Sequence, residues 1–135
     1  MIATAQLLYF RSAYADFVTN DYSADREFRI ANIAKSATEL DASLIVIGDD
    51  WSSVVAYYAQ RKSFALSNWA PVSLWQRILA TPQKFLGDRR LGGVVYCADM
   101  APHEAERQKL VSEFVSGRPV LGEAGGCQFL APNKK

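Results

Sequence analysis

The sequence predicts an α/β fold: a three-layer, Rossmann-like open sheet, mostly parallel, with a C-terminal antiparallel hairpin and an extra N-terminal helix. Short runs of apolar, often β-branched residues alternate with longer segments whose apolar residues recur every three or four positions, as in strands joined by helices. Near the end, Gly125-Gly126 separates two short apolar stretches, which indicates a hairpin. At 135 residues, half of them hydrophobic, the chain suits one domain.

Two helices are expected before the first strand. Residues 3–18 carry an apolar stripe at helical spacing, which consists of Leu7, Phe10, Tyr14 and Phe17. The plainer interpretation packs this stripe on its own domain, and the alternative is a connector to something upstream. Ser23 or Asp25 can cap a second helix that ends near Glu39. Its inward face is expected to hold Phe28, Ile30, Ile33, Ala34 and Ala37. This divides the chain into a connector helix, residues 1–22, and one α/β domain, residues 23–135.

Residues 40–62 form the unit around which the rest is arranged. Residues 44–47 are a continuous apolar run, typical of a strand buried on both faces, and Gly48 ends it. The following residues at helical spacing are Val54, Val55, Tyr58 and Arg61. Asp50 or Ser52 can accept a hydrogen bond from the free N–H groups at the start of this helix. A strand, a turn and a helix are therefore expected here.

Two more strand and helix pairs follow. Residues 63–66 are expected to form a strand, and the next helix begins at Pro71 and is interrupted by Pro82. Its apolar face consists of Val72, Trp75, Ile78 and Leu79. Residues 92–97 form the third strand, and Pro102 and Glu104 suit the first turn of the helix after it. That helix carries Leu110, Phe114 and Val115 and ends at Gly117.

Composition excludes several classes of protein. The net charge is +1 and the basic residues are scattered, so the sequence gives no footprint for nucleic acid. No apolar stretch is long enough to span a bilayer, so the chain as given is expected to be soluble. Cys97 and Cys127 belong to no metal-binding motif, which argues against zinc. Both lie in apolar strand contexts, and we expect free, buried thiols.

Polar and aromatic residues follow the three expected parallel strands, where α/β proteins bind ligands. The candidate ligand-binding residues are Asp49, Asp50, Trp51, Ser52, Asn68, Trp69 and Asp99. Carboxylates and an amide can bind sugar hydroxyls, and an indole ring can cover the apolar face of a sugar. The more usual fate is structural, with the aspartates capping helices and the tryptophans in the core, and this outcome is favoured. For Trp51 in particular we expect a packing role.

The sequence provides little for catalysis. His103 is the only histidine, and no GxSxG or Cys/His motif is present, so nucleophilic hydrolysis has no visible residues. The turn after residues 44–47 reads GDDWSS rather than GxGxxG, which argues against a dinucleotide. Two adjacent aspartates alone are a weak signal for a hard cation. We therefore assign no catalytic residue, metal or cofactor.

The stretch IVIGDDWSSVVAYYAQRKSFALSNW resembles the soluble C-terminal domain of bacterial multi-spanning glycosyltransferases related to the dolichyl-phosphate-mannose protein mannosyltransferases. The shared pattern is a strand, a D-W-S turn, a Tyr-Tyr, an Arg-Lys and a short strand. LGGVVYC and GEAGGCQFLAP also resemble that domain, so the similarity covers roughly residues 20–131. Such enzymes take a sugar from a polyprenyl-phosphate carrier, and their catalytic carboxylates lie on loops between membrane helices. No such loop is present here, so no catalytic residue is carried over.

This resemblance implies a non-catalytic, extracytoplasmic (periplasmic) domain of a membrane-bound glycosyltransferase. Its partners would be the membrane-embedded remainder of that protein and a glycan acceptor or polyprenyl-phosphate sugar. Residues 3–18 would then descend from the last membrane helix. Two alternatives remain. One is a free-standing module that binds a sugar or another small molecule, and the other is a small enzyme in which Asp49, Asp50 or Asp99 acts as acid or base.

Overall fold

A computed structural model describes residues 2–50 and 52–133 and confirms an α/β fold built on one five-stranded mixed sheet. The strands are β1 (Ser43–Ile47), β2 (Lys62–Leu66), β3 (Leu91–Cys97), β4 (Val120–Ala124) and β5 (Cys127–Leu130). The α-helices are α1 (Ile2–Thr19), α2 (Arg26–Ala37), α3 (Val54–Ala59), α4 (Val72–Ala80) and α5 (Ala105–Val115). Three short 3₁₀ helices join them, namely η1 (Tyr22–Ala24), η2 (Pro82–Phe85) and η3 (Ala98–Met100).

The strand order is β2-β1-β3-β5-β4. β1 pairs in parallel with both β2 and β3, whereas β5 runs antiparallel to β3 and to β4. All five residues of β1 are buried, because the strand is central and helices cover both of its faces. The expected parallel centre and closing hairpin are therefore confirmed.

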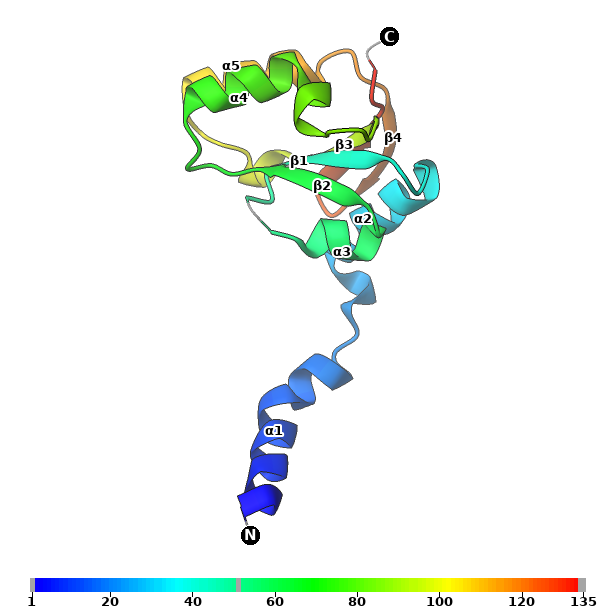
Figure 1. Ribbon diagram of the computed structural model, residues 1–135, viewed down its shortest axis with the longest axis vertical. Helices are drawn as coiled ribbons and strands as arrows, with labels where there is room; N and C mark the ends of the chain where they lie inside the picture. Colours follow the sequence, from blue (N-terminus) through cyan, green and yellow to red (C-terminus); the bar gives the residue numbers. More distant parts are fainter. Residues whose placement is uncertain (1, 51, 134–135) are drawn as a thin grey trace.

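Helices lie on both faces of the sheet (Figure 1). On one face, α2 and α3 contribute Ile30, Ala34 and Val55 to a core that includes Val46 and Phe129. On the other face, α4 and α5 contribute their own apolar side chains, which pack on Ile45, Ile47 and Val94. The members from these two helices are Trp75, Ile78, Leu79, Val111 and Phe114. Alternate residues of β1 thus point into opposite cores, as the pleat of a strand requires.

The expectation of free thiols is wrong, because Cys97 and Cys127 form a disulfide. The two residues lie directly opposite each other on β3 and β5, with their Cα atoms 4.1 Å apart. Both are buried in the core beside α2. Neighbouring antiparallel strands bring opposed residues within bonding distance. The distance between the two cysteines in the sequence gave no indication of this strand pairing.

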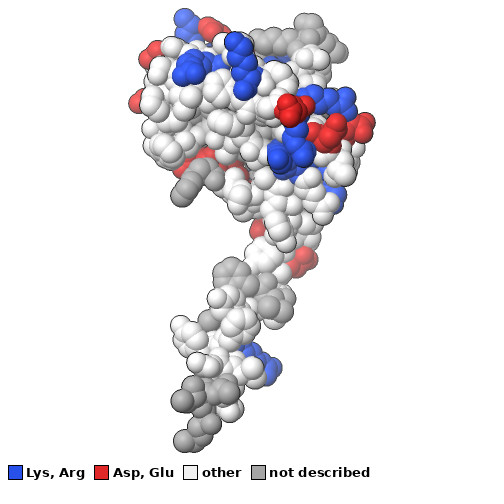
Figure 2. Space-filling model, in the orientation of Figure 1, with Lys and Arg blue, Asp and Glu red and all other residues white. Residues whose placement is uncertain are grey.

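α1 stands away from the domain (Figure 1), so the expected packing of its apolar stripe on that domain is wrong. Leu7, Phe10 and Tyr14 are 71%, 60% and 48% exposed. The side chain of Phe17 lies outside the described part of the chain. Figure 2 shows that the visible face of α1 carries little charge. Within the described residues, no helix has both the length and the apolar character needed to cross a bilayer.

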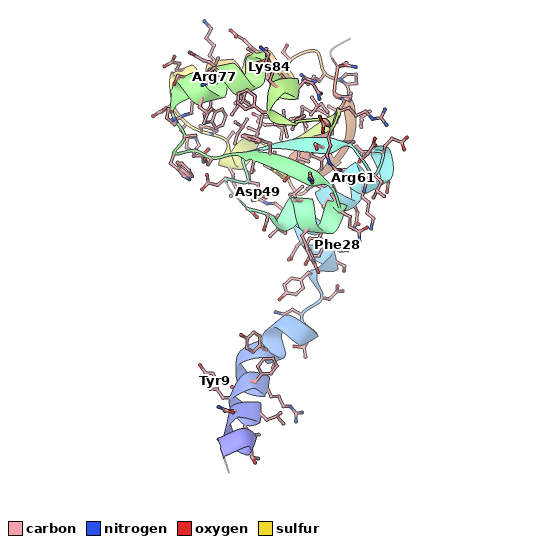
Figure 3. All side chains as sticks on the ribbon, viewed as in Figure 1. Tyr9, Phe28, Asp49, Arg61, Arg77 and Lys84 are labelled. Carbon is pink, nitrogen blue, oxygen red and sulfur yellow. A yellow bond between two sulfur atoms is a disulfide. The ribbon has the colours of Figure 1, made fainter. Side chains whose placement is uncertain are left out.

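Two helix boundaries differ from the sequence prediction. α3 ends at Ala59 because Gln60 adopts a left-handed conformation with φ 53°, so Arg61 is not on the helix. Arg61 turns back instead, and its buried guanidinium donates hydrogen bonds to the carbonyl oxygens of Lys35 and Thr38 at the end of α2. α5 begins at Ala105, after Glu104, so Pro102 is not in its first turn. Figure 3 places Arg61 and Asp49 at opposite ends of the sheet.

Candidate functional site

The carboxyl ends of β1, β2 and β3 meet at one edge of the sheet. Ile47, the last residue of β1, lies opposite Leu66 of β2 and Tyr96 of β3. The segments that follow these strands form what we call the rim, and its described candidate residues are Asp49, Asp50, Ser52, Asn68, Trp69 and Asp99. Trp51 lies outside the described residues, and its packing role stays a prediction. The parallel pairing on which the candidate site depends is confirmed.

Close backbone contact holds the turn after β1. Gly48 has φ +87°, and a Cβ atom there would lie 2.0 Å from the carbonyl oxygen of Cys97, so the turn can approach β3 only with glycine. The Oδ1 atom of Asp50 accepts a hydrogen bond of 2.9 Å from the backbone N–H of Asn68. Asp50 therefore joins the turns after β1 and β2 rather than capping α3. The expected capping by Ser52 is confirmed, since its Oγ accepts a 3.2 Å hydrogen bond from the N–H of Val54.

Asp49 is the buried carboxyl group of the rim, with 6% of its surface exposed. Among the described residues, its Oδ2 atom has no hydrogen-bond donor. Burial raises the pKa of Asp49, and the charge of Glu27 raises it further, while Arg26 and a hydrogen bond with Ser52 lower it. The net direction is upward, so Asp49 holds its proton more tightly than an exposed aspartate does. Titratable groups in such surroundings are frequent in functional sites.

Arg26 and Glu27, in the first turn of α2, complete the charged cluster. Arg26 Nε lies 2.7 Å from Glu27 Oε1, and Arg26 Nη1 lies 2.7 Å from Asp99 Oδ2. Asp99 is thus an ion-pair partner of α2 and not a helix cap. Burial raises the pKa of Glu27, but hydrogen bonds from Arg26 and from its own backbone N–H lower it more, so the net shift is downward. The hydrogen bond from Arg26 to Glu27 is the main cause of the raised pKa of Arg26.

Sequence reasoning missed Arg26 and Glu27. They lie more than twenty positions before the turn of Asp49, and only the packing of α2 against α3 and the β4–β5 hairpin brings them to the rim. A charged first turn of a helix is common at solvated surfaces and carries no indication of a site. The structure shows how closely the hairpin approaches α2: a Cβ at Gly125 would lie 2.1 Å from the Cβ of Arg26, so this turn needs glycine.

The two described aromatic and amide candidates lie at the surface. Trp69 is 73% exposed, so the favoured expectation of a core position is wrong for this tryptophan. Asn68 is also exposed, and it contacts the rim through its backbone N–H. Trp75 is instead the buried tryptophan, and its Nε1–H donates a 3.2 Å hydrogen bond to the carbonyl oxygen of Ser67. The rim therefore combines a buried carboxyl group with an exposed indole ring.

A cleft of about 440 Å³ lies beside the rim, between the start of the hairpin and the end of β3. Its polar lining consists of Arg29, Tyr96, Glu123 and Gln128, and Gln128 Nε2 donates a 2.7 Å hydrogen bond to Glu123 Oε1. None of the candidate residues lines this cleft. Ala98, the first residue of η3, borders both this cleft and a second one of about 280 Å³ beside α5. Movement of η3 would change the shape of both clefts.

Within the described residues, no group of three or more histidine, cysteine, aspartate or glutamate side chains is placed to hold a metal ion. The rim places a buried carboxyl group, that of Asp49, beside the hydrogen-bonding side chains of Asp50 and Ser52. No protein-family model, curated protein or solved structure matches the chain.

Proposed function

We propose that residues 23–135 are a non-catalytic, extracytoplasmic accessory domain of a membrane-bound glycosyltransferase-like protein that uses a polyprenyl-phosphate sugar. Residues 1–22 connect this domain to the membrane-embedded remainder. The domain contacts the acceptor or the carrier, or stabilises the assembly. We further propose that its sheet belongs to the three-layer, Rossmann-like class, which the order β2-β1-β3 and the helices on both faces support.

The observation that carries the proposal is the exposed apolar surface of α1. Leu7, Leu8, Tyr9 and Phe10 are between 60% and 76% exposed, and four consecutive residues cover every side of a helix. Over these four residues the surface of α1 is apolar on every side, and such a surface is normally buried in protein or lipid. α1 is therefore suited to continue into a larger, apolar assembly.

Two further observations support the proposal. The disulfide between Cys97 and Cys127 fits an oxidising compartment outside the cytoplasm. The resemblance in the sequence runs from α2 to the closing hairpin, which is the whole domain without α1. The disulfide and the resemblance are independent of each other, and both support a location outside the cytoplasm.

An antibody raised against the purified domain tests the proposal in the cells that make it. We expect the antigen in the membrane fraction, in a chain much larger than 15.0 kDa, and accessible to protease added outside the cytoplasmic membrane. A 15.0 kDa antigen in the cytosol would contradict the proposal. The purified chain should also fail to turn over polyprenyl-linked or nucleotide sugars. Turnover that is lost with Asp49→Asn or Asp50→Asn would show a catalytic domain.

A second candidate function is a free-standing module that binds a sugar at the rim. The exposed ring of Trp69 favours it, since Trp69 follows Asn68, whose N–H bonds to Asp50, and an indole face and carboxylates together suit a sugar ring. Titration of the protein with monosaccharides, followed by tryptophan fluorescence, tests it. Binding that disappears in Trp69→Ala, while the unfolding curve stays unchanged, would favour this function over the first.

A further inference from the structure

The guanidinium group of Arg26 uses all three of its nitrogen atoms, one within α2 and two to join α2 to η3. Nε faces Glu27 and Nη1 faces Asp99, both at 2.7 Å, and Nη2 contacts the sulfur atom of Met100. Among the described residues, Arg26 forms no hydrogen bond with Asp49, although its charge acts on that group. In this arrangement the guanidinium group of Arg26 bonds to partners other than the buried carboxyl group of Asp49.

The surroundings of Asp49 suit an uncharged group. The charges of Glu27 and Arg26 on α2 and of Asp50 in its own turn act on Asp49, and Ser52 forms a hydrogen bond with it. Asp99 of η3 forms an ion pair with the same Arg26. Besides Asp49, the cluster thus contains three carboxyl groups, those of Glu27, Asp50 and Asp99, and one cation, Arg26. Without a proton, Oδ2 would be a buried anionic oxygen without a donor among the described residues. Burial of an unpaired charge is far less favourable than burial of a neutral carboxyl group.

The backbone of Asp49 cannot move outward to expose the ionised carboxyl group to water. Gly48 lies against the backbone of Cys97, and the side chain of Asp50 is bonded to the turn after β2. The response left to the cluster is a turn of the Arg26 side chain toward Asp49. Asp99 can release Arg26 readily, because 57% of its side chain is exposed and water can replace the guanidinium.

We propose that Asp49 is the proton-binding group of a switch at the rim. With Asp49 neutral, Arg26 holds η3 against α2. With Asp49 ionised, Arg26 turns to Asp49, and η3 with Asp99 and Met100 separates from α2. Because Ala98 of η3 borders two clefts, the switch changes the shape of both.

The raised pKa of Asp49 is consistent with this mechanism. The proton stays on Asp49 at pH values at which exposed aspartates have already lost theirs, so the change occurs above the ordinary aspartate range. The group that titrates is buried, whereas the contact that breaks is at the surface. A small change in pH can therefore alter the outer shape of the rim without unfolding the core.

Met100 provides a direct probe, because Met1 and Met100 are the chain's two methionines. The full chain is labelled with ¹³C at the methionine methyl groups and, in a second sample, at the aspartate carboxyl carbons, and both are followed by NMR across pH. We expect the Met100 methyl resonance to shift with the same midpoint as the Asp49 carboxyl resonance. The hydrogen exchange of the Ala101 amide, which bonds to the carbonyl oxygen of Ala98, should accelerate over the same range.

Three variants separate the switch from general effects of pH. Asp49→Asn keeps the size of the side chain and should abolish both the Met100 shift and the change in Ala101 exchange. Arg26→Lys keeps the charge but loses the forked guanidinium group that reaches both Glu27 and Asp99. Asp49 should therefore still titrate, while the Met100 methyl resonance should no longer shift with pH. Asp88→Asn is the matched control, because Asp88 is exposed and lies in the turn before β3; it should behave like the parent.

Several outcomes would overturn the switch. A Met100 resonance that does not move while Asp49 titrates would show that Arg26 stays on Asp99. A shift that persists in Asp49→Asn would assign the titration to another group. If calcium added at constant pH produced the Met100 shift and titration of Asp49 did not, the cluster would be a cation site instead.

Discussion

At the scale of the residue, Asp49 links stability to pH. Its pKa in the folded chain lies above the ordinary value of 3.8, so the folded state binds this proton more tightly than the unfolded state does. The stabilisation is fully present below the unfolded pKa and is lost as the pH rises through the folded pKa. We expect Asp49→Asn to match the parent at low pH and to be more stable than the parent above the folded pKa, because the variant buries no charge there.

Urea unfolding at several pH values between about 3 and about 8 measures this difference. Asp88→Asn again serves as the control, since Asp88 is exposed. A stability advantage of Asp49→Asn that falls, rather than rises, with pH would contradict a raised pKa of Asp49 in the folded chain.

The tryptophans give a second test at this scale. Trp75 is fully buried between the sheet and α5, and Trp75→Ala should lower the free energy of unfolding by about 3–5 kcal/mol. Trp69 is 73% exposed, and Trp69→Ala should change the free energy of unfolding by less than about 0.5 kcal/mol. Guanidinium unfolding of the two variants in parallel gives the comparison. Equal losses would refute the contrast between a core and a surface tryptophan.

At the scale of the element, Arg61 holds together the ends of two helices. Its guanidinium donates hydrogen bonds to the carbonyl oxygens of Lys35 and Thr38 at the end of α2, and of Ala59 and Gln60 at the end of α3. These carbonyl groups have no partner within their helices. Arg61→Met keeps the length and apolar stem of the side chain, and should lower the free energy of unfolding by about 3 kcal/mol because several acceptors lose a charged donor.

Arg61→Lys separates charge from geometry. An ammonium group is a single point and cannot reach both helix ends, so the loss should lie between that of Arg61→Met and zero. Thermal unfolding followed by circular dichroism measures the order of the three proteins. A lysine variant as stable as the parent would mean that charge at the helix C-termini, rather than the bonding pattern, carries the effect.

At the scale of the whole molecule, the disulfide closes a long loop. Cys97 and Cys127 are 30 positions apart, and the loop includes α5 and β4. By loop-closure entropy, the double variant Cys97→Ala/Cys127→Ala should lose about 3–4 kcal/mol of stability. Urea unfolding of the oxidised parent beside the variant tests this.

Alkylation without reduction, followed by mass spectrometry, checks the pairing itself: addition of two alkyl groups would show free thiols.

Local patterns were sufficient to predict the order of helices and strands. The apolar run of β1 and the Gly125-Gly126 turn predicted the parallel centre and the hairpin, and both are confirmed. Their physical basis is local, because periodicity and turn residues act over a few positions. The same holds for the rim, since Asp50 and Asn68 meet as a direct result of parallel pairing.

Tertiary contacts explain what the sequence did not predict. The disulfide depends on the register of β5 against β3, and the charged cluster depends on where α2 packs. Trp69 and Trp75 belong to one short segment, yet one is exposed and the other buried, and composition does not separate them. The apolar stripe on α1 is not covered by its own domain, and an apolar partner for it stays a prediction.

The closed loop also has a mechanical consequence. If the chain is pulled from its two ends, the residues between Cys97 and Cys127 cannot extend, because tension passes directly from β3 to β5 through the sulfur atoms. At about 3.5 Å per residue, roughly 100 Å of length is removed from the fully extended chain. An optical-trap experiment should therefore record a gain in length on unfolding that is shorter by this amount, and a reducing agent should restore it. A domain carried at the end of an exposed helix would, in this way, stretch less under load than its number of residues suggests.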